Sequence, residues 1–266
     1  MEQNLSKKTR TESDLIGSRE VPESALYGVQ TLRGIENFRI SKFHLNEYPL
    51  FIQALAITKM GAAVANRELD LLTEEQADAI LKACKEILEG KHHDQFPVDM
   101  IQGGAGTTTN MNANEVIANR ALELMGHQRG EYQYCSPNDH VNRSQSTNDA
   151  YPTAIHIGLY YTHLKLVKHF EVLIESFRKK ATEFAHVIKM GRTQLEDAVP
   201  MTLGQTFNGF ASILRHEVKN LDFAAQDFLT VNMGATAIGT GITAEPEYAE
   251  KCIAALRKIT GLDIKL

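Results

Sequence analysis

Three polar loops hold the residue types that could bind a small anion and act on it. The first covers residues 102–110 and has the sequence QGGAGTTTN. Its glycines allow backbone N–H groups to approach a ligand, and its threonine hydroxyls add further donors. Because a helix is expected to follow, the positive potential of a helix N-terminus favours a carboxylate or a phosphate here. A flexible turn is the alternative interpretation of the same residues.

The glycines of this loop do not form a nucleotide-binding motif. No predicted strand precedes them, and the G-x-G-x-x-G spacing of a dinucleotide site is absent. The Gly-Lys-Ser/Thr ending of a P-loop is absent as well. A carboxylate or phosphate cradle is therefore the functional interpretation that the loop favours.

The second loop covers residues 142–149, with the sequence NRSQSTND, and lies just before Pro152, which suits the first turn of a helix. Ser146, Thr147 and Asn148 could present hydroxyl and amide donors to a carboxylate. Capping of the following helix explains one of these residues without any ligand. A run of eight polar residues exceeds what capping requires, so we expect the loop to take part in binding.

The third loop covers residues 191–200, with the sequence GRTQLEDAVP, and joins two long predicted helices. Connections within helix bundles are commonly short and plain. A polar loop of ten residues at the end of a bundle therefore favours a functional role.

Apolar residues recur every three or four positions over most of the chain, which predicts helices. Thr73 and Gln76 have the spacing of a capping box, and Gly90 suits the left-handed position that ends a helix. Strand patterns are scarce, so the predicted fold class is all-α and multi-helical. The predicted helices cover residues 50–68, 73–88, 112–125, 152–189, 202–230 and 247–259.

The segments outside these helices predict irregular structure. Residues 1–14 are polar and predict a loose tail, and residues 15–49 predict irregular structure that leaves room for a short hairpin. Residues 231–245 are rich in Gly, Ala and Thr and predict a loop. We expect a small, mainly helical N-terminal domain over residues 1–145, followed by part of a long central helix bundle over residues 146–266.

The helix predicted over residues 152–189 is unusually long and apolar. About 37 residues at 1.5 Å each extend roughly 55 Å, which exceeds the roughly 30 Å width of a small domain. Its apolar residues form more than a single stripe. A helix that is apolar nearly all round must be buried on several sides. We therefore expect a helix bundle in which this helix packs against other subunits.

The composition excludes several classes of protein. The formal net charge of −5 argues against a nucleic-acid partner. No apolar run approaches the roughly 18 residues of a membrane span, and the first twenty residues lack the apolar core of a signal peptide. Cys84, Cys135 and Cys252 form no C-x-x-C pair and suit a reducing compartment, so a cytoplasmic protein is expected. The histidines show no metal-ligand spacing.

In this order along the chain, the three loops resemble the aspartase/fumarase superfamily, and within it the ammonia-lyases that act on L-aspartate. The resemblance extends essentially from Leu15 to the end of the chain. The stretches that carry it are GSREVP at 17–22, YGVQT at 27–31, GT at 106–107, NMNANE at 110–115, SQSTND at 144–149, GRTQL at 191–195 and GQ at 204–205.

This resemblance implies a homotetramer built around long central helices, with each active site assembled from loops of three subunits. The implied reaction is the reversible conversion of L-aspartate to fumarate and ammonia through an enediolate-type intermediate. It implies that no cofactor takes part in the chemistry. Arg33 is a further candidate for an anion contact. The substrate-binding residues that it implies are Thr107, Ser146, Thr147, Asn148, Thr193 and Gln194.

Gln194 separates two activities within the superfamily. The hydratases that act on fumarate carry a histidine at this position, implicated in handling water. A glutamine amide does not exchange protons near neutral pH, so hydration is disfavoured and loss of ammonia is favoured. A fumarase-type hydratase is the alternative enzyme, and a helical assembly module without catalysis is the alternative outside enzymes.

The most specific motif of the superfamily is absent from the sequence. It is a Gly-Ser-Ser loop that supplies the catalytic base, and it is expected to lie beyond Leu266. We therefore expect the chain to be the N-terminal part of the enzyme and to be inactive alone, because it contains no general base.

Overall fold

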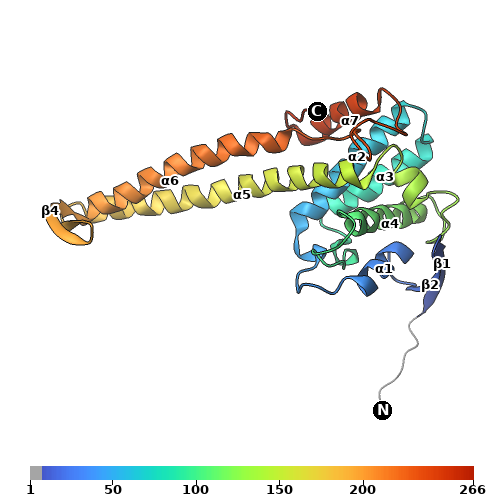
Figure 1. Ribbon diagram of the computed structural model, residues 1–266, viewed down its shortest axis with the longest axis horizontal. Helices are drawn as coiled ribbons and strands as arrows, with labels where there is room; N and C mark the ends of the chain where they lie inside the picture. The colour runs from blue at the N-terminus through green and yellow to red at the C-terminus, as the bar shows by residue number, and fades with distance from the viewer. Residues whose placement is uncertain (1–7) are drawn as a thin grey trace, which may run out of the picture. The chain divides into compact units, whose positions relative to one another are not determined.

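The computed structural model describes residues 8–266, which divide into two compact units (Figure 1). The first unit comprises residues up to Gly158 together with Leu229–Leu266, and the second comprises Leu159–Phe228. Helices dominate both units, and the strands form only two small two-stranded sheets, which confirms the predicted multi-helical class. No helix within residues 8–266 has the length and apolarity to cross a membrane.

The first unit begins with a β-hairpin and a short helix. Strands β1 (Thr9–Asp14) and β2 (Gly17–Pro22) pair antiparallel, and helix α1 (Val29–Asn37) follows. The predicted loose tail is therefore wrong for residues 9–14, while residues 1–7 lie outside the described part of the chain. The predicted short hairpin exists, but it starts earlier than expected, and α1 was not predicted.

Four helices, together with the start of the longest helix, form the core of the first unit. They are α2 (Pro49–Glu68), α3 (Glu74–Leu88), α4 (Thr107–Leu124), α7 (Tyr248–Thr260) and the first turns of α5 (Thr147–Glu183). Helix α2 is central, because it packs against α3, α4 and α7. One-turn helices cover Leu45–Glu47, His93–Gln95 and Gln226–Leu229, and a π-helical turn covers Pro137–Val141.

The local signals of α3 are confirmed in detail. The Thr73 hydroxyl accepts a hydrogen bond from the Gln76 backbone N–H, and the Gln76 side chain accepts one from the Thr73 N–H. Gly90 has a φ of +87°, in the left-handed region that favours glycine. The helices predicted over residues 50–68 and 247–259 are also confirmed, within one residue at each end.

Helix α4 begins at Thr107, five residues before the predicted start at 112. Its first turn contains three threonines, which are weak helix formers. A side chain from the preceding loop compensates, because the Gln102 amide oxygen accepts a hydrogen bond from the Thr109 N–H at 2.8 Å. The helix therefore extends back to the glycines that precede it.

The second unit consists of the rest of α5, a β-hairpin and helix α6 (Leu203–Ala225). Strands β3 (Ile188–Thr193) and β4 (Glu196–Thr202) form the hairpin. The irregular loop predicted over residues 190–201 is therefore wrong. Helix α5 has 37 residues, close to the predicted length, but it covers 147–183 and not 152–189. Helix α6 ends at 225, before the predicted end near 230.

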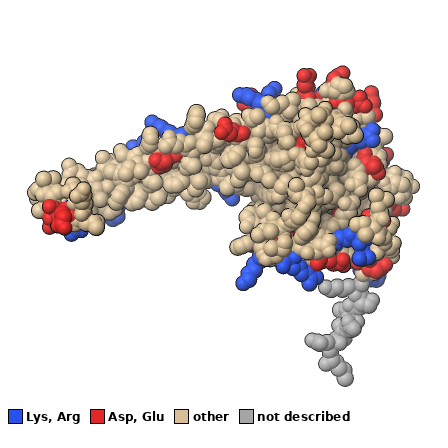
Figure 2. All heavy atoms as spheres, in the orientation of Figure 1, with Lys and Arg blue, Asp and Glu red and all other residues tan. Residues whose placement is uncertain are grey.

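The second unit has a small core of its own. Ile174, Ala211 and Val218 are buried and Phe177 packs beside them. The ring centroid of Phe177 lies 6.0 Å from that of Phe207. Large apolar side chains remain exposed on α5 and α6, and the visible face of this unit carries few charges (Figure 2). These exposed side chains are Leu159, Leu164, Leu166, Val172, Leu173, Phe210, Ile213 and Phe223. The expected burial of α5 against other subunits stays a prediction.

An ion pair between α3 and α4 predicts how the first unit responds to acid. Arg120 donates two hydrogen bonds to the Glu86 carboxylate, at 2.5 and 2.8 Å, and His92 lies 2.9 Å from it. The Arg120 contact lowers the pKa of Glu86 from 4.5 to about 2. Because the pKa is lowered in the folded state, the stabilisation is present above pH 4.5 and is lost as the pH falls toward 2.

We therefore expect Glu86→Gln to lower the free energy of unfolding at pH 7 by about 1–3 kcal/mol. The variant should also lose part of the acid sensitivity between pH 4.5 and 2. Urea unfolding at a series of pH values measures both effects. Glu89→Gln is the matched control, because this exposed glutamate bonds Lys91 at the surface. Equal effects of the two substitutions would contradict the prediction.

Candidate active site

The N-termini of α4 and α5 lie against each other in the first unit. Gly106, the residue before α4, has a φ of +90°, and a Cβ placed on it would lie 2.4 Å from the ring of Tyr151 in α5. The Asn110 side-chain amide of α4 donates a hydrogen bond to the Thr147 hydroxyl of α5, at 3.2 Å. The positive potentials of two helix N-termini therefore converge here.

Four of the six predicted substrate residues lie at this convergence. Thr107 and Thr147 are the first residues of α4 and α5. Ser146 precedes α5 and Asn148 follows in its first turn. Ser146 and Thr147 are half-buried, whereas Thr107 and Asn148 are exposed. The structure thus brings the first two predicted loops together at one place.

Ser146 caps α5, as the simpler explanation of this loop proposed. Its hydroxyl accepts a hydrogen bond from the Asn148 N–H at 3.1 Å, and its own N–H donates to the Asp149 carboxylate at 2.9 Å. Capping accounts for Ser146 and Asp149 alone. The hydroxyl of Thr147 and the amide of Asn148 contact other elements, so capping does not explain them.

The Asn148 side chain is oriented by a loop from the end of the chain. Its Nδ2 donates a hydrogen bond to the carbonyl oxygen of Ala237, at 2.8 Å. With the nitrogen held in this way, the Oδ1 of the exposed amide is an acceptor. An acceptor at the edge of an anion site suits a cationic group on the same ligand.

A buried lysine lies beneath the convergence. Lys59 of α2 is 1% exposed, and its Nζ donates hydrogen bonds to three amide oxygens. They belong to Asn110 at 2.7 Å, Gln145 at 2.8 Å and Asn142 at 3.0 Å. Burial lowers the pKa of Lys59 to about 7, and the charge of Asp149 opposes that shift. The lysine therefore ties α2 to both polar loops.

The amides around Lys59 form a continuous network that ends at the site. The Asn142 Oδ1 also accepts hydrogen bonds from the Nδ2 groups of Asn110 and Asn114, each at 3.1 Å. Asn110 then donates to Thr147. Lys59 was not identified in the sequence analysis, although it is the single charged residue in the mostly apolar run at residues 54–65, which is a signal that could have identified it.

Hydrogen bonds hold the glycine loop before α4 in place. The Gln102 amide nitrogen donates to the Asp99 carbonyl and to the Thr109 hydroxyl, both at 2.8 Å. The Thr107 hydroxyl donates to the Gly104 carbonyl at 2.6 Å. The Asp99 carboxylate accepts from the Ser41 hydroxyl and from three backbone N–H groups, and the Ser41 contact is the main cause that lowers the pKa of Asp99 to about 2. The alternative of a plain flexible turn does not fit these contacts.

Thr193 and Gln194 lie in the second unit, at the tip of the β3–β4 hairpin, and both are exposed. Gln194 and Leu195 form the two-residue turn, with φ values of +49° and +70°. Glycine or asparagine is the usual choice in such a turn. Two non-glycine residues in left-handed conformation store local strain, which is common at functional sites.

Arg33 forms an ion pair with Asp14 in the first unit. Its guanidinium donates two hydrogen bonds to the Asp14 carboxylate, both at 2.9 Å, and one to the Gly17 carbonyl at 2.8 Å. These bonds use Nε and Nη2 and fix the β1–β2 hairpin against α1, and an anion contact by Arg33 stays a prediction. Within residues 8–266, no group of three or more His, Cys, Asp or Glu side chains could hold a metal ion.

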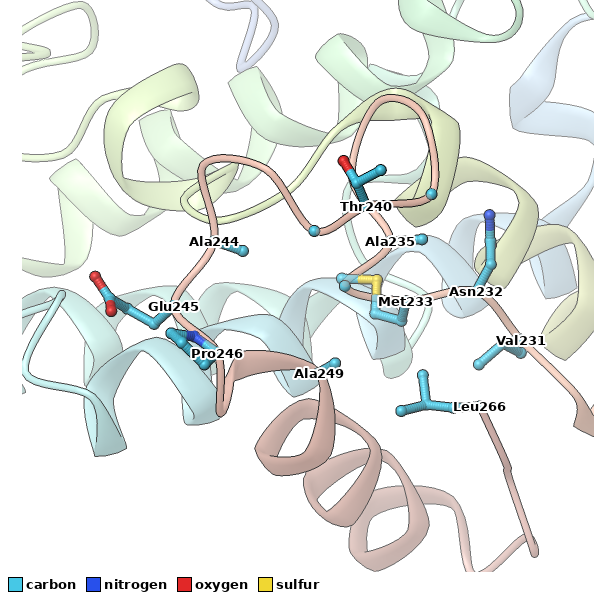
Figure 3. A pocket seen from close by; sticks show the side chains of 13 residues that line it. Val231, Asn232, Met233, Ala235, Thr240, Ala244, Glu245, Pro246, Ala249 and Leu266 are labelled. Carbon is cyan, nitrogen blue, oxygen red and sulfur yellow. The ribbon is translucent and has the colours of Figure 1, made fainter.

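An open hollow of about 650 Å³ lies between the loop at residues 231–245 and the start of α7 (Figure 3). Its lining is mostly backbone and small side chains, with Met233, Glu245 and Leu266 among the larger ones. None of the six predicted substrate residues lines it. The hollow is therefore separate from the convergence of α4 and α5.

Comparison with known proteins identifies close relatives. Aspartate ammonia-lyase of Escherichia coli (strain K12) is 54% identical over 258 residues, which are 97% of this chain and 54% of the relative. Aspartate ammonia-lyase of Pseudomonas fluorescens is 56% identical over 253 residues, which are 95% of this chain and 53% of the relative. The chain spans about half the length of the curated relatives it matches.

Solved structures show the same fold. A structure described as fumarate lyase:delta crystallin from Brucella melitensis bound to cobalt has a TM-score of 0.95 and 51% identity, over 97% of this chain and 56% of that chain. A class II fumarase from Schistosoma mansoni has a TM-score of 0.87 and 35% identity, over 96% of this chain and 53% of that chain.

A family model described as lyase matches residues 17–266. The match begins two residues after Leu15, where the resemblance of the loops begins, and it continues to the last residue. The resemblance inferred from these loops is thereby confirmed. This chain is a member of that lyase family.

Proposed function

We propose that this chain supplies much of the substrate-binding part of an aspartate ammonia-lyase, which converts L-aspartate reversibly to fumarate and ammonia. The observation that carries the proposal is the convergence of α4 and α5, which gathers Thr107, Ser146, Thr147 and Asn148 at two helix N-termini. The aspartate ammonia-lyases among its relatives support the choice of substrate.

The chemistry explains why such a site needs many donors. A base removes a weakly acidic proton from the carbon next to the side-chain carboxylate, and negative charge then builds on that carboxylate. Each preorganised donor that points at the developing charge lowers the activation free energy by about 3 kcal/mol. The helix N-termini with Ser146 and Thr147 are proposed to hold this carboxylate. Thr107 completes the site in this unit.

Asn148 and Gln194 favour an ammonia-lyase over a hydratase. The Asn148 Oδ1 is free to accept a hydrogen bond from the ammonium group of aspartate, because its Nδ2 is held by Ala237. Gln194 supplies an amide that does not exchange protons at neutral pH. The amino group of aspartate is already an ammonium group and leaves as neutral ammonia. It therefore needs less acid catalysis than a hydroxyl group, which would otherwise leave as hydroxide. Thr193 and Gln194 are proposed as further substrate-binding residues of the complete enzyme.

The complete enzyme is proposed to be a homotetramer with sites built from several subunits. The apolar side chains exposed on α5 and α6 support this proposal, because an exposed apolar face of that extent is typical of an interface. The general base is proposed to lie outside these 266 residues, in the other half of the length that the relatives have. The domain boundary near residue 145 stays a prediction.

The test uses the protein extended to the length of its relatives. Formation of fumarate is followed by ultraviolet absorbance, with L-aspartate and L-malate supplied separately. We expect fumarate from L-aspartate and none from L-malate. Fumarate from L-malate alone would overturn the substrate and make the protein a hydratase. Turnover by the purified 266-residue chain would contradict the placement of the base.

A further inference from the structure

The loop at residues 231–245 is attached to the first turn of α5 by a set of side-chain hydrogen bonds. The attachment begins with Pro152, which lies inside α5 and has no N–H to donate. The carbonyl of Asn148, four residues earlier, therefore lacks its helical partner. The Nδ2 of Asn232 donates to this carbonyl at 3.0 Å. The proline thus creates an acceptor that the loop uses.

The buried carboxylate of Asp149 provides the second link. Asp149 is 0% exposed, and its Oδ2 accepts hydrogen bonds from the N–H groups of Gly234 at 3.1 Å and Thr236 at 2.9 Å. Its Oδ1 accepts from the Ser146 N–H. One carboxylate therefore holds both the cap of α5 and the loop.

The third link is the bond from Asn148 Nδ2 to the Ala237 carbonyl. Loop residues 232–237 thus follow the first turn of α5 closely. The loop accepts backbone strain to do so, because Thr236 has a φ of +57°. Such a conformation is unfavourable for a non-glycine residue, and the two bonds to Asp149 hold the loop in it.

We propose that Asp149 is a positioning residue for the reaction. It holds the loop at residues 231–245 against α5, and the loop in turn fixes the Asn148 amide with its oxygen toward the ammonium group of the substrate. This inference rests on the proposed function, because it assigns the ammonium contact of that same site. It also assigns a role to residues 232–237, which the polar loops of the sequence did not indicate.

The groups that face Asp149 come from two packed helices. Lys59 of α2 lies close enough for its charge to favour the carboxylate, whereas burial raises the pKa of Asp149. Tyr248 and Cys252 of α7 are buried on the same side, and burial raises their pKa values, so both stay neutral. The carboxylate therefore acts through its hydrogen bonds to backbone N–H groups.

Asp149→Asn in the full-length protein tests the proposal. The substituted amide has the same shape but only one oxygen, so either the Ser146 N–H or the two loop N–H groups must face an NH2 group. Asn232→Ala is the second variant, since it removes one loop contact without touching the Asp149 carboxylate or the Ser146 cap. Asp94→Asn, at an exposed aspartate that bonds Gln95, is the control.

We expect the KM for L-aspartate to rise at least tenfold in Asp149→Asn and about threefold in Asn232→Ala, with smaller changes in kcat. The inhibition constant of succinate, which lacks the ammonium group, should change less than twofold in Asn232→Ala. A parallel rise of both constants in Asn232→Ala, or a KM within twofold of the wild type in that variant, would overturn the proposal. Asn232→Ala decides the matter if Asp149→Asn does not fold.

A second measurement separates this inference from the proposed function. Hydrogen exchange at the backbone amides of Gly234 and Thr236 should be at least tenfold faster in Asp149→Asn than in the wild type or in Asp94→Asn. Unchanged exchange would overturn the attachment of the loop. Absence of aspartate turnover by the wild type would overturn the proposed function, while the exchange result would still show whether Asp149 holds the loop.

Discussion

Lys59→Met is expected to destabilise the first unit by about 2–5 kcal/mol. The substitution keeps the length of the side chain but removes all three donors. The Asn142 oxygen keeps the amide donors of Asn110 and Asn114, whereas the oxygens of Asn110 and Gln145 lose the donor that Lys59 gives them. A buried polar group without a partner costs about 1–3 kcal/mol. The loss exceeds the gain from no longer burying an ammonium group, because that group is hydrogen-bonded in all three directions.

Urea unfolding measures this loss, with Lys82→Met as the control. Lys82 is an exposed lysine of α3, and its substitution should change the free energy of unfolding by no more than about 0.5 kcal/mol. In the full-length protein, Lys59→Met should also raise the KM for L-aspartate, because the network that ends at Thr147 loses its centre. Equal stability of the two variants, with an unchanged KM, would show that the amides rearrange to satisfy one another.

Local patterns predicted the helices whose signals lie within their own sequence. The capping box of Thr73 and Gln76 and the terminal Gly90 identified α3 almost to the residue. The length of α5 was also predicted, because its apolar periodicity is long and regular. The start of α5 was placed five residues late, because Pro152 was assigned to the first turn and not to the interior.

Helix α1 could not be predicted, because its stability comes from distant parts of the chain. The N–H groups of Gly28, Gln30 and Thr31 donate to the buried Glu115 carboxylate of α4. The Val29 N–H donates to Glu12 of β1. The sequence of residues 15–49 predicted irregular structure here. Capping of α1 by Glu115, which lies more than eighty residues away along the chain, overrides that local signal.

The β3–β4 hairpin was missed for a related reason. A two-residue hairpin turn is normally recognised by Asn-Gly or Asp-Gly, and here it is formed by Gln194 and Leu195. A sequence that breaks its own local rule at a residue proposed to touch the substrate is consistent with selection for the site. The partners of Lys59 were likewise hidden in the sequence, because they lie on α4 and on the second polar loop and meet Lys59 only in the folded chain.

The candidate site was predicted by residue type more than by geometry. Ser146, Thr147 and Asn148 were identified because eight polar residues exceed what a helix cap requires. Only the structure distinguishes their roles, because it shows that Ser146 caps α5 and that Asn148 contacts Ala237. The contribution of residues 232–237 was hidden, because a stretch rich in Gly, Ala and Thr has no pattern that distinguishes a loop that positions a site residue from a surface loop.

Gly106→Ala is expected to disturb the convergence of α4 and α5 and to destabilise the first unit. Gly106 has a φ of +90°, so alanine there costs about 1–2 kcal/mol from the backbone alone. The added Cβ would also lie 2.4 Å from the Tyr151 ring. That ring is held by an edge contact with Phe51 at 5.8 Å. Forcing extra volume into a packed contact costs roughly a further 1–3 kcal/mol.

Gly126→Ala separates the two contributions. Gly126 has a φ of +83° at the end of α4, and a Cβ there would meet no atom within 4 Å. Its substitution therefore reports the backbone cost alone. The difference between the two variants in the free energy of unfolding, measured with urea, reports the displacement of Tyr151. In the full-length protein, Gly106→Ala should lower kcat/KM for L-aspartate, because the starts of α4 and α5 move apart, while Gly126→Ala should leave it unchanged. Equal losses in the free energy of unfolding of the two variants would mean that the Tyr151 ring moves freely. The contact between Gly106 and Tyr151 would then not set the distance between Thr107 and Thr147.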